Sequence, residues 1–153
     1  MTLQEEQLNY FLVHVFNHIL RIEEESLSKG KYKDLSINEM HVIEAVCNCE
    51  KEQMNTMKEL SKRLMITASS LTISVKCLEQ KGYLIRTKAE TDKRKVFVSS
   101  TQSGKDAYKE HAKFHHALVK SITGELKEEE MITLNLALGR LDEFFMKPTE
   151  RRI

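Results

Sequence analysis

The stretch 56–101 constrains the fold more than any other part of the chain, because it carries two short helix signals followed by two alternating segments. Thr56 followed by Glu59 is a capping-box pattern, in which the threonine accepts from a backbone amide and the glutamate reaches back. This pattern predicts a short helix that ends at Leu64. Residues 65–66 then form a turn.

A second helix is predicted directly after this turn. Thr67 is placed to cap it, and Gly82 can take the left-handed conformation that ends it after about Lys81. Apolar residues at steps of four and three predict its buried face: Leu71, Val75 and Leu78. The opposite face is mostly small and rich in hydroxyl groups, and it consists of Ser69, Ser70, Thr72, Ile73, Ser74 and Lys76.

A hairpin is predicted after the second helix. Residues 83–88 and 95–100 alternate between apolar and polar side chains, as strands with one buried face do. The turn between them is charged and reads Glu90-Thr91-Asp92-Lys93-Arg94-Lys95. Two helices joined by a turn and followed by a basic hairpin are typical of a winged helix-turn-helix.

The distribution of charge agrees with this interpretation. Within residues 56–101 ten basic side chains outnumber four acidic ones, a net charge of +6. Because the whole chain carries +1, the remainder carries −5. Concentrated positive charge attracts the phosphate backbone of nucleic acid. The alternative is a merely solvated charged surface, which the coincidence with the winged helix disfavours.

The hydroxyl-rich face of the second helix and the charged turn of the hairpin both have side chains suited to double-stranded DNA. Small hydroxyl side chains let a helix lie deep in the major groove, where Ala68 or Ile73 could contact thymine methyl groups. Arginine suits the narrow minor groove, and Asp92 can hold a neighbouring guanidinium in a fixed orientation. The predicted DNA-binding residues are Thr67, Ser69, Ser70, Thr72, Ile73, Ser74, Lys76, Asp92, Lys93, Arg94 and Lys95.

Helical periodicity outside this stretch predicts four more helices, at about residues 4–27, 37–47, 102–123 and 127–146. The second of them begins with another capping box, formed by Ser36 and Glu39. The last two carry apolar stripes too extensive for a small winged-helix core to cover, which favours a subunit interface.

The expected fold is therefore mainly α with a small β-hairpin. We expect one domain, in which residues 36–101 form the winged helix-turn-helix and residues 1–35 and 102–153 form a helical dimerisation region. A helix that crosses a bilayer needs a run of about eighteen apolar residues, and no run in the sequence approaches that length. The N-terminus is polar and does not resemble a targeting segment. We therefore expect a cytoplasmic protein.

Cysteine usage and motifs bear on catalysis and redox chemistry. An odd count of three cysteines predicts reduced thiols rather than a disulfide framework. The sequence contains no nucleophile elbow, phosphate-binding glycine loop or HExxH motif, so we expect neither an enzyme nor a required cofactor.

Three motifs resemble the MarR family of bacterial transcriptional regulators. They are Leu78-Glu79-Gln80-Lys81-Gly82-Tyr83 at the end of the second helix, Asp92-Lys93-Arg94 in the wing, and Thr101-Gln102-Ser103-Gly104 at the start of the next helix. The sequence departs from the family pattern at Ser100, where leucine is usual. The resemblance implies a homodimer built by the first and last helices, with each winged helix contacting one half of a palindromic operator.

Further segments resemble the fatty-acid-biosynthesis repressors of that family. They are 16–24, 33–43 and 113–119. This resemblance implies a repressor of fatty acid biosynthesis genes whose corepressor is a long acyl chain on acyl carrier protein. By analogy the chain would enter an apolar tunnel lined by Phe16, Leu20, Met40, His41, Ile43, Phe114 and Leu118. The alternative for each of these residues is an ordinary core position.

A metal is the alternative effector. His111 and His115 are four residues apart on a predicted helix and can point the same way, and a carboxylate from another helix would complete a zinc site. The candidate ligands are Glu24, His41, His111 and His115. They resemble the ligand placement of a zinc-responsive branch of the family. A regulator of another small ligand is the remaining alternative.

Overall fold

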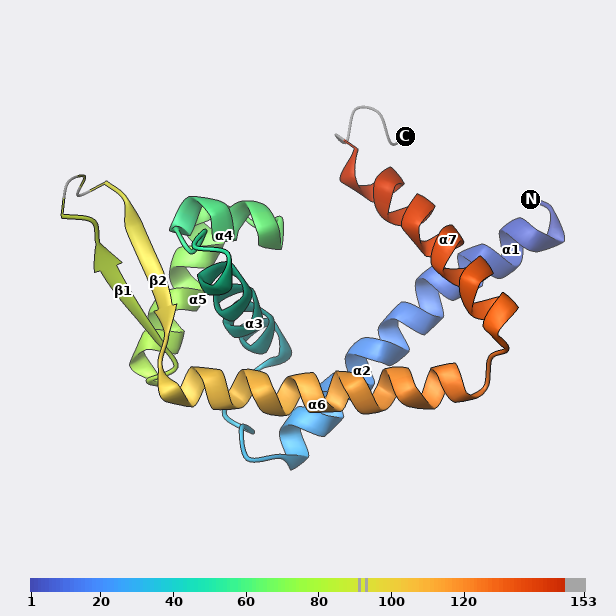
Figure 1. Ribbon diagram of the computed structural model, residues 1–153, viewed down its shortest axis with the longest axis horizontal. Coiled ribbons are helices and arrows are strands. Elements are labelled where there is room, and N and C mark those ends of the chain that lie inside the picture. Colours follow the sequence, from blue (N-terminus) through green and yellow to red (C-terminus); the bar gives the residue numbers. More distant parts are fainter. Residues whose placement is uncertain (91, 93, 148–153) are drawn as a thin grey trace. The chain divides into compact units, whose positions relative to one another are not determined.

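The computed structural model describes residues 1–90, 92 and 94–147. Figure 1 shows helices with a single two-stranded hairpin among these residues. The elements in chain order are α1 Leu3–Tyr10, η1 Phe11–Val15, α2 Phe16–Lys29, α3 Ile37–Lys51, α4 Met57–Leu64, α5 Ala68–Gln80, β1 Leu84–Lys88, β2 Val96–Ser100, α6 Gln102–Gly124 and α7 Glu128–Met146. The mainly α fold with a small hairpin is confirmed.

The chain divides into two compact units, Met1–Ala112 and Lys113–Ile153. The boundary lies inside α6 rather than at either predicted subdivision, 35/36 or 101/102. The arrangement as one domain stays a prediction.

The predicted first helix begins earlier and is interrupted. Thr2 caps it by accepting from the Glu5 backbone amide, and Glu5 accepts from the Thr2 amide, so the helix starts at Leu3. One wide turn, η1, then separates α1 from α2. A π turn inserts one extra residue into the helix, and this changes the spacing of the apolar residues too little for the sequence to indicate the turn.

Helix α3 forms the centre of the winged-helix core. Its start is fixed by the predicted capping box between Ser36 and Glu39. It extends one turn beyond the predicted end, because Cys49 is also buried. Helices α2, α4 and α5 and strand β2 all pack against it. The fully buried side chains around it include Met40, Ile43, Val46, Leu60, Leu71, Leu78 and Val98.

The helix-turn-helix is confirmed, with one conformation that the sequence did not indicate. Thr56 and Thr67 cap α4 and α5 as predicted, by accepting from the amides of Glu59 and Ser70. Helix α4 ends at Leu64, and the next residue, Met65, has a φ of 52°, in the left-handed region usually taken by glycine.

The hairpin is antiparallel and pairs Leu84 with Ser100 and Lys88 with Val96. A short third segment joins its other edge, since the Val98 amide donates to the Asn55 carbonyl and Asn55 Nδ2 donates to the Val98 carbonyl. The wing is therefore attached to the segment before α4 by one main-chain bond and one side-chain bond.

The start of α6 is fastened to the end of α5. Thr101 Oγ1 donates to the Gly82 carbonyl at 2.7 Å and accepts from the Gly104 amide at 3.1 Å. A Cβ atom on Gly104 would collide with the Tyr83 carbonyl oxygen, which explains the glycine of this motif. Ser100 is buried at the position where the family has leucine, and its hydroxyl donates to the Glu50 carboxylate on α3.

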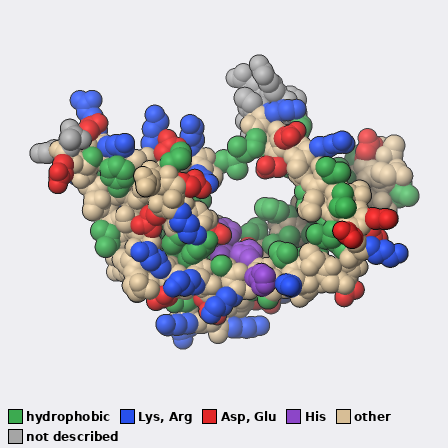
Figure 2. Space-filling model, viewed as in Figure 1, with side chains coloured by type: hydrophobic (Ala, Val, Ile, Leu, Met, Phe, Trp, Pro, Cys, Tyr) green, Lys and Arg blue, Asp and Glu red, His purple; other side chains and the backbone are tan. Residues whose placement is uncertain are grey.

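The second unit contains the end of α6 and helix α7. The capping interaction of α7 is a bond from the Lys127 amide to Glu130 Oε2 at 2.8 Å. Much of the apolar surface of α7 is exposed, and Figure 2 shows hydrophobic side chains along it. Among the described residues, no helix combines the length and the apolar character needed to cross a membrane.

Candidate nucleic-acid interface

Helix α5 has one buried and one exposed face. Leu71, Val75 and Leu78 have no exposed surface, which confirms the predicted inward face. On the other face Ile73 is 72% exposed. Six further predicted DNA-binding residues lie in the same exposed or half-exposed region: Thr67, Ser69, Ser70, Thr72, Ser74 and Lys76. The structure thus brings together every predicted DNA-binding residue of this helix.

The hydroxyl groups of this face are arranged by the helix itself. Thr72 Oγ1 donates to the Ala68 carbonyl at 2.8 Å, and Ser74 Oγ donates to the Ser70 carbonyl at 3.2 Å. These hydroxyls already use their single protons, so their oxygen lone pairs remain to accept bonds from base amino groups.

The tip of the wing is shaped by Asp92. Its carboxylate accepts from the Arg94 backbone amide at 3.0 Å, and its carbonyl accepts from the Lys95 amide at 2.9 Å. The bond to the Arg94 amide uses Oδ1 and leaves Oδ2 able to accept, so the orientation of a neighbouring guanidinium by Asp92 stays a prediction. The Arg94 side chain is exposed, and Lys95 Nζ lies 5.3 Å from the centroid of the Phe97 ring. Lys93 lies outside the described residues.

An ion pair joins the wing to α5. The Arg86 amide and Nε donate to the two carboxylate oxygens of Glu79, at 2.9 and 2.6 Å. Sequence reasoning missed this pair, although both side chains had been counted in the local charge. Figure 2 shows Lys and Arg side chains projecting over the wing and α4, at the upper left of the view.

The predicted effector residues lie in different environments. Met40 and Ile43 are 1% and 0% exposed and belong to the winged-helix core. Leu20 is half-buried, whereas Phe16 is 63% exposed on α2. Phe114 and Leu118 are half-buried on α6. Their role in a tunnel stays a prediction.

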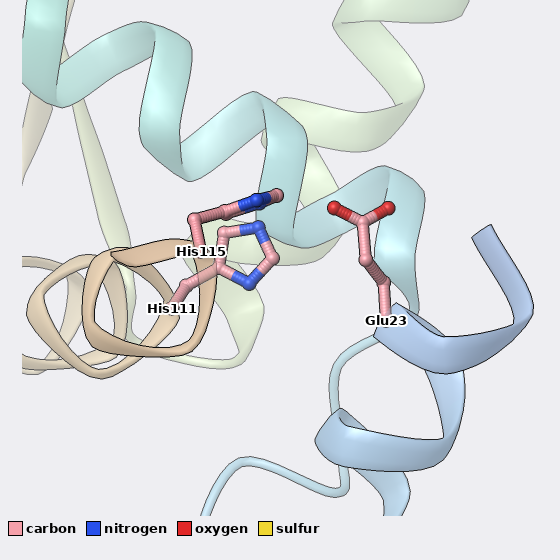
Figure 3. Close-up of side chains that lie close together, drawn as sticks. All are labelled: Glu23, His111 and His115. Atoms are coloured by element: carbon pink, nitrogen blue, oxygen red, sulfur yellow. The ribbon is translucent and has the colours of Figure 1, made fainter. Parts of the chain in front are cut away.

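A carboxylate and three imidazoles gather where α2, α3 and α6 meet. The Glu23 side chain is 4% exposed, and its Oε2 lies 3.7 Å from His41 Nε2. The rings of His41 and His111 have centroids 5.9 Å apart. His115 follows His111 by one turn of α6, and Glu23, His111 and His115 each offer a ligand atom within 4.8 Å of the others (Figure 3).

This cluster corrects one candidate ligand. Glu24 is exposed, whereas Glu23 is buried beside the histidines. Adjacent residues of a helix differ by about 100° in direction, so only one of the two carboxylates can face α6. Imidazole nitrogens together with a carboxylate oxygen are suited to zinc, and the residues present therefore fit that metal.

Two of the three thiols, those of Cys47 and Cys77, have a raised pKa. Cys47, Cys49 and Cys77 are free thiols. Burial raises the pKa of the Cys47 thiol, and the hydrogen bond to Glu39 raises the pKa of the Cys77 thiol. A raised pKa lowers the fraction of reactive thiolate.

Solved structures of DNA-bound regulators resemble this fold. The structure of Streptococcus pneumoniae FabT in complex with DNA matches with a TM-score of 0.85 and 34% identity, over 92% of this chain and 96% of that chain. A mutant of MarR from E. coli complexed with operator DNA matches with a TM-score of 0.67 and 25% identity, over 92% and 99%. The fold and the exposed α5 face define a MarR-type DNA-binding transcriptional regulator.

Sequence comparison places the chain more narrowly. The family described as transcriptional regulator SarA/Rot matches residues 21–111, and the chain belongs to this family. The HTH-type transcriptional regulator SarZ of Staphylococcus aureus is 36% identical over 75 residues, and that of Staphylococcus epidermidis is 39% identical over 57. The chain spans 49% and 38% of the length of these two relatives, respectively.

Proposed function

We propose that two copies of this chain form a sequence-specific repressor that binds a palindromic operator. The observation that carries this proposal is the exposed α5 face, with its small hydroxyl side chains and Ile73, beside a basic wing. In this arrangement α5 enters the major groove and Arg94 reaches the adjacent minor groove. The DNA complexes of FabT and MarR support the proposal.

A second copy of the chain is the partner implied by the exposed apolar surface. On α1, η1 and α2 the exposed apolar side chains include Leu8, Phe11, Phe16 and Ile19, and on α7 they include Leu136, Leu138, Phe144 and Phe145. Apolar patches of this kind usually mark protein interfaces. Sedimentation analysis should give a dimer, and Phe16→Glu should shift it toward monomer.

The direct test of DNA binding is a titration of duplexes selected by the protein from a random pool. Enrichment of one inverted-repeat sequence, with one dimer bound per repeat, is the expected result. Salt-sensitive binding without enrichment of any sequence would contradict sequence-specific repression.

The effector we propose is a long acyl chain on acyl carrier protein, acting as corepressor of fatty acid biosynthesis genes. The support is the resemblance of segments 16–24, 33–43 and 113–119 to that class of repressor, together with the 34% identity to FabT. Long-chain acyl carrier protein should tighten operator binding, whereas the carrier protein without an acyl chain should not.

Zinc is the second candidate effector, favoured by the cluster of Glu23, His41, His111 and His115. These side chains would hold the ion between α2, α3 and α6, with the nitrogen and oxygen ligands that zinc prefers. If zinc tightens operator binding and His111→Ala abolishes that response, the acyl corepressor is the wrong assignment. If the response to long-chain acyl carrier protein persists in the His111→Ala variant, the acyl corepressor is supported.

A further inference from the structure

A concave surface of about 420 Å³ lies between α4, α5 and the wing. Three cationic side chains line it, Lys58, Arg86 and Arg94, together with the hydroxyl groups of Ser61 and Thr72. No carboxylate of the described part of the chain is among its lining residues. A concavity with cations on several walls and no acidic wall attracts an anion.

The cation on β1 is held in place for such a ligand. Glu79, which does not line the concavity, accepts from the backbone amide and Nε of Arg86. This pairing leaves the two Nη groups of the guanidinium to donate elsewhere. A guanidinium fixed at one edge is pre-organised to bind phosphate oxygens with its other edge.

The cations must supply the donors, because the hydroxyls are already engaged. Ser61 Oγ donates to the Ile66 carbonyl at 2.7 Å, and Thr72 Oγ1 donates to the Ala68 carbonyl at 2.8 Å. With Arg94 directed to the minor groove, an anion in the concavity would therefore be bound mainly by Lys58 and Arg86.

The neighbouring concavity has a different charge pattern. It has a volume of about 550 Å³ and shares Lys58 and Arg94, but Glu59 and Asp92 also line it. Carboxylates close to the ligand would repel an anion. The anion site is thus the smaller concavity, where α5 and the wing meet.

We propose that this concavity binds one phosphate group of the DNA backbone, with Lys58 and Arg86 as its ligands, while Arg94 reaches the minor groove. The proposal rests on the proposed DNA-binding function and adds residues of α4 and β1 to the interface. The bound phosphate lies on the strand that runs between the groove contacted by α5 and the groove contacted by the wing. It determines the position of the protein on the duplex without contributing to base recognition.

The test is a scan of single methylphosphonate substitutions, each of which removes the charge of one phosphate in a selected duplex. With the wild-type protein, substitution at one position per half-site should weaken binding about tenfold. The double variant Lys58→Met with Arg86→Gln should bind the unmodified duplex more weakly than the wild type does. A methylphosphonate at the sensitive position should then weaken its binding by less than about twofold. Lys105→Met, which removes an exposed cation on α6 outside the concavity, should keep the wild-type profile.

Three outcomes would overturn the proposal. If the double variant retains its native circular dichroism spectrum and loses as much as the wild type at every methylphosphonate, Lys58 and Arg86 bind no backbone phosphate. If inorganic phosphate competes with DNA more strongly than chloride at equal ionic strength, and does so equally in the wild type and the double variant, the anion site does not involve Lys58 and Arg86. A wild-type protein that binds no duplex would refute both the proposed function and the phosphate site, whereas the first two results leave the function intact.

Discussion

Arg86 donates to both carboxylate oxygens of Glu79, through its backbone amide and its Nε atom. The two residues belong to β1 and α5, so the pair holds the wing in a fixed position beside the helix proposed to enter the major groove. Their side chains are 35% and 25% exposed, so the contribution to folding stability is small while the effect on geometry is direct.

Glu79→Gln should therefore weaken DNA binding by about tenfold, the value of one charge-assisted hydrogen bond, and change the free energy of unfolding by less than about 1 kcal/mol. Fluorescence anisotropy and urea denaturation measure the two quantities. Glu25→Gln, which breaks the exposed pair of Arg21 and Glu25 on α2, is the matched control and should leave DNA affinity unchanged. Equal effects of the two variants would contradict the positioning role.

Arg94→Ala should weaken DNA binding without altering the melting temperature, because the side chain is exposed at the tip of the wing. The slope of log affinity against log salt should become shallower by about one for each wing that contacts the duplex. Titrations at several salt concentrations check this prediction. An unchanged affinity would show that the wing does not contact DNA.

Leu71→Ala should change the stability of the protein, whereas Ile73→Ala should change its DNA recognition, although both residues lie on α5. Leu71 has no exposed surface, and its truncation should lower the free energy of unfolding by about 2–5 kcal/mol. Ile73 is 72% exposed, so its truncation should leave stability nearly unchanged and reduce discrimination for thymine at one operator position. Replacing that thymine with uracil removes the methyl group and should mimic the Ile73 variant.

Glu39→Gln should make stability less dependent on pH. Burial raises the pKa of the Glu39 carboxyl. Hydrogen bonds from Lys81, the Ser36 amide and Cys77 together lower it by more than burial raises it, so the net pKa is below the usual 4.5. A lowered pKa in the folded state stabilises the protein above the unfolded-state pKa, and this contribution is lost as pH falls through the folded-state pKa.

The glutamine variant retains a carbonyl oxygen for the capping box but loses the charge that pairs with Lys81 at 2.8 Å. Urea denaturation at neutral pH should show a loss of about 1–2 kcal/mol, because the carboxylate is only 14% exposed. The difference from the wild type should shrink at pH values below the folded-state pKa. A difference independent of pH would indicate lost packing instead.

The helix starts were predictable because capping is local. Ser36, Thr56 and Thr67 accept from amides three residues ahead, and a pattern of four residues contains all the information for that bond. The end of α5 was predictable for the same reason, because Gly82 takes the left-handed conformation, with a φ of 81°, just after the helix. The wide turn at Phe11–Val15 and the left-handed Met65 were not predictable, since neither has a characteristic residue type at its position.

The candidate sites were predictable in composition and less so in geometry. The residues of the α5 face followed from helical periodicity, because one buried stripe determines which positions remain outside. The choice of Glu23 over Glu24 depends on the rotation of α2 against α3, which local sequence does not determine. The same is true of Asp92, whose bond to the Arg94 amide depends on the conformation of the turn.

By itself the sequence determined the order of elements, the helix caps and the concentration of positive charge on the winged helix, because these depend on neighbours along the chain. Only the tertiary structure decided that Arg86 pairs with Glu79, and that Lys58, Arg86 and Arg94 line one concavity. Those residues belong to three separate elements, and their distances depend on how α4, α5 and the hairpin pack around the shared core of α3.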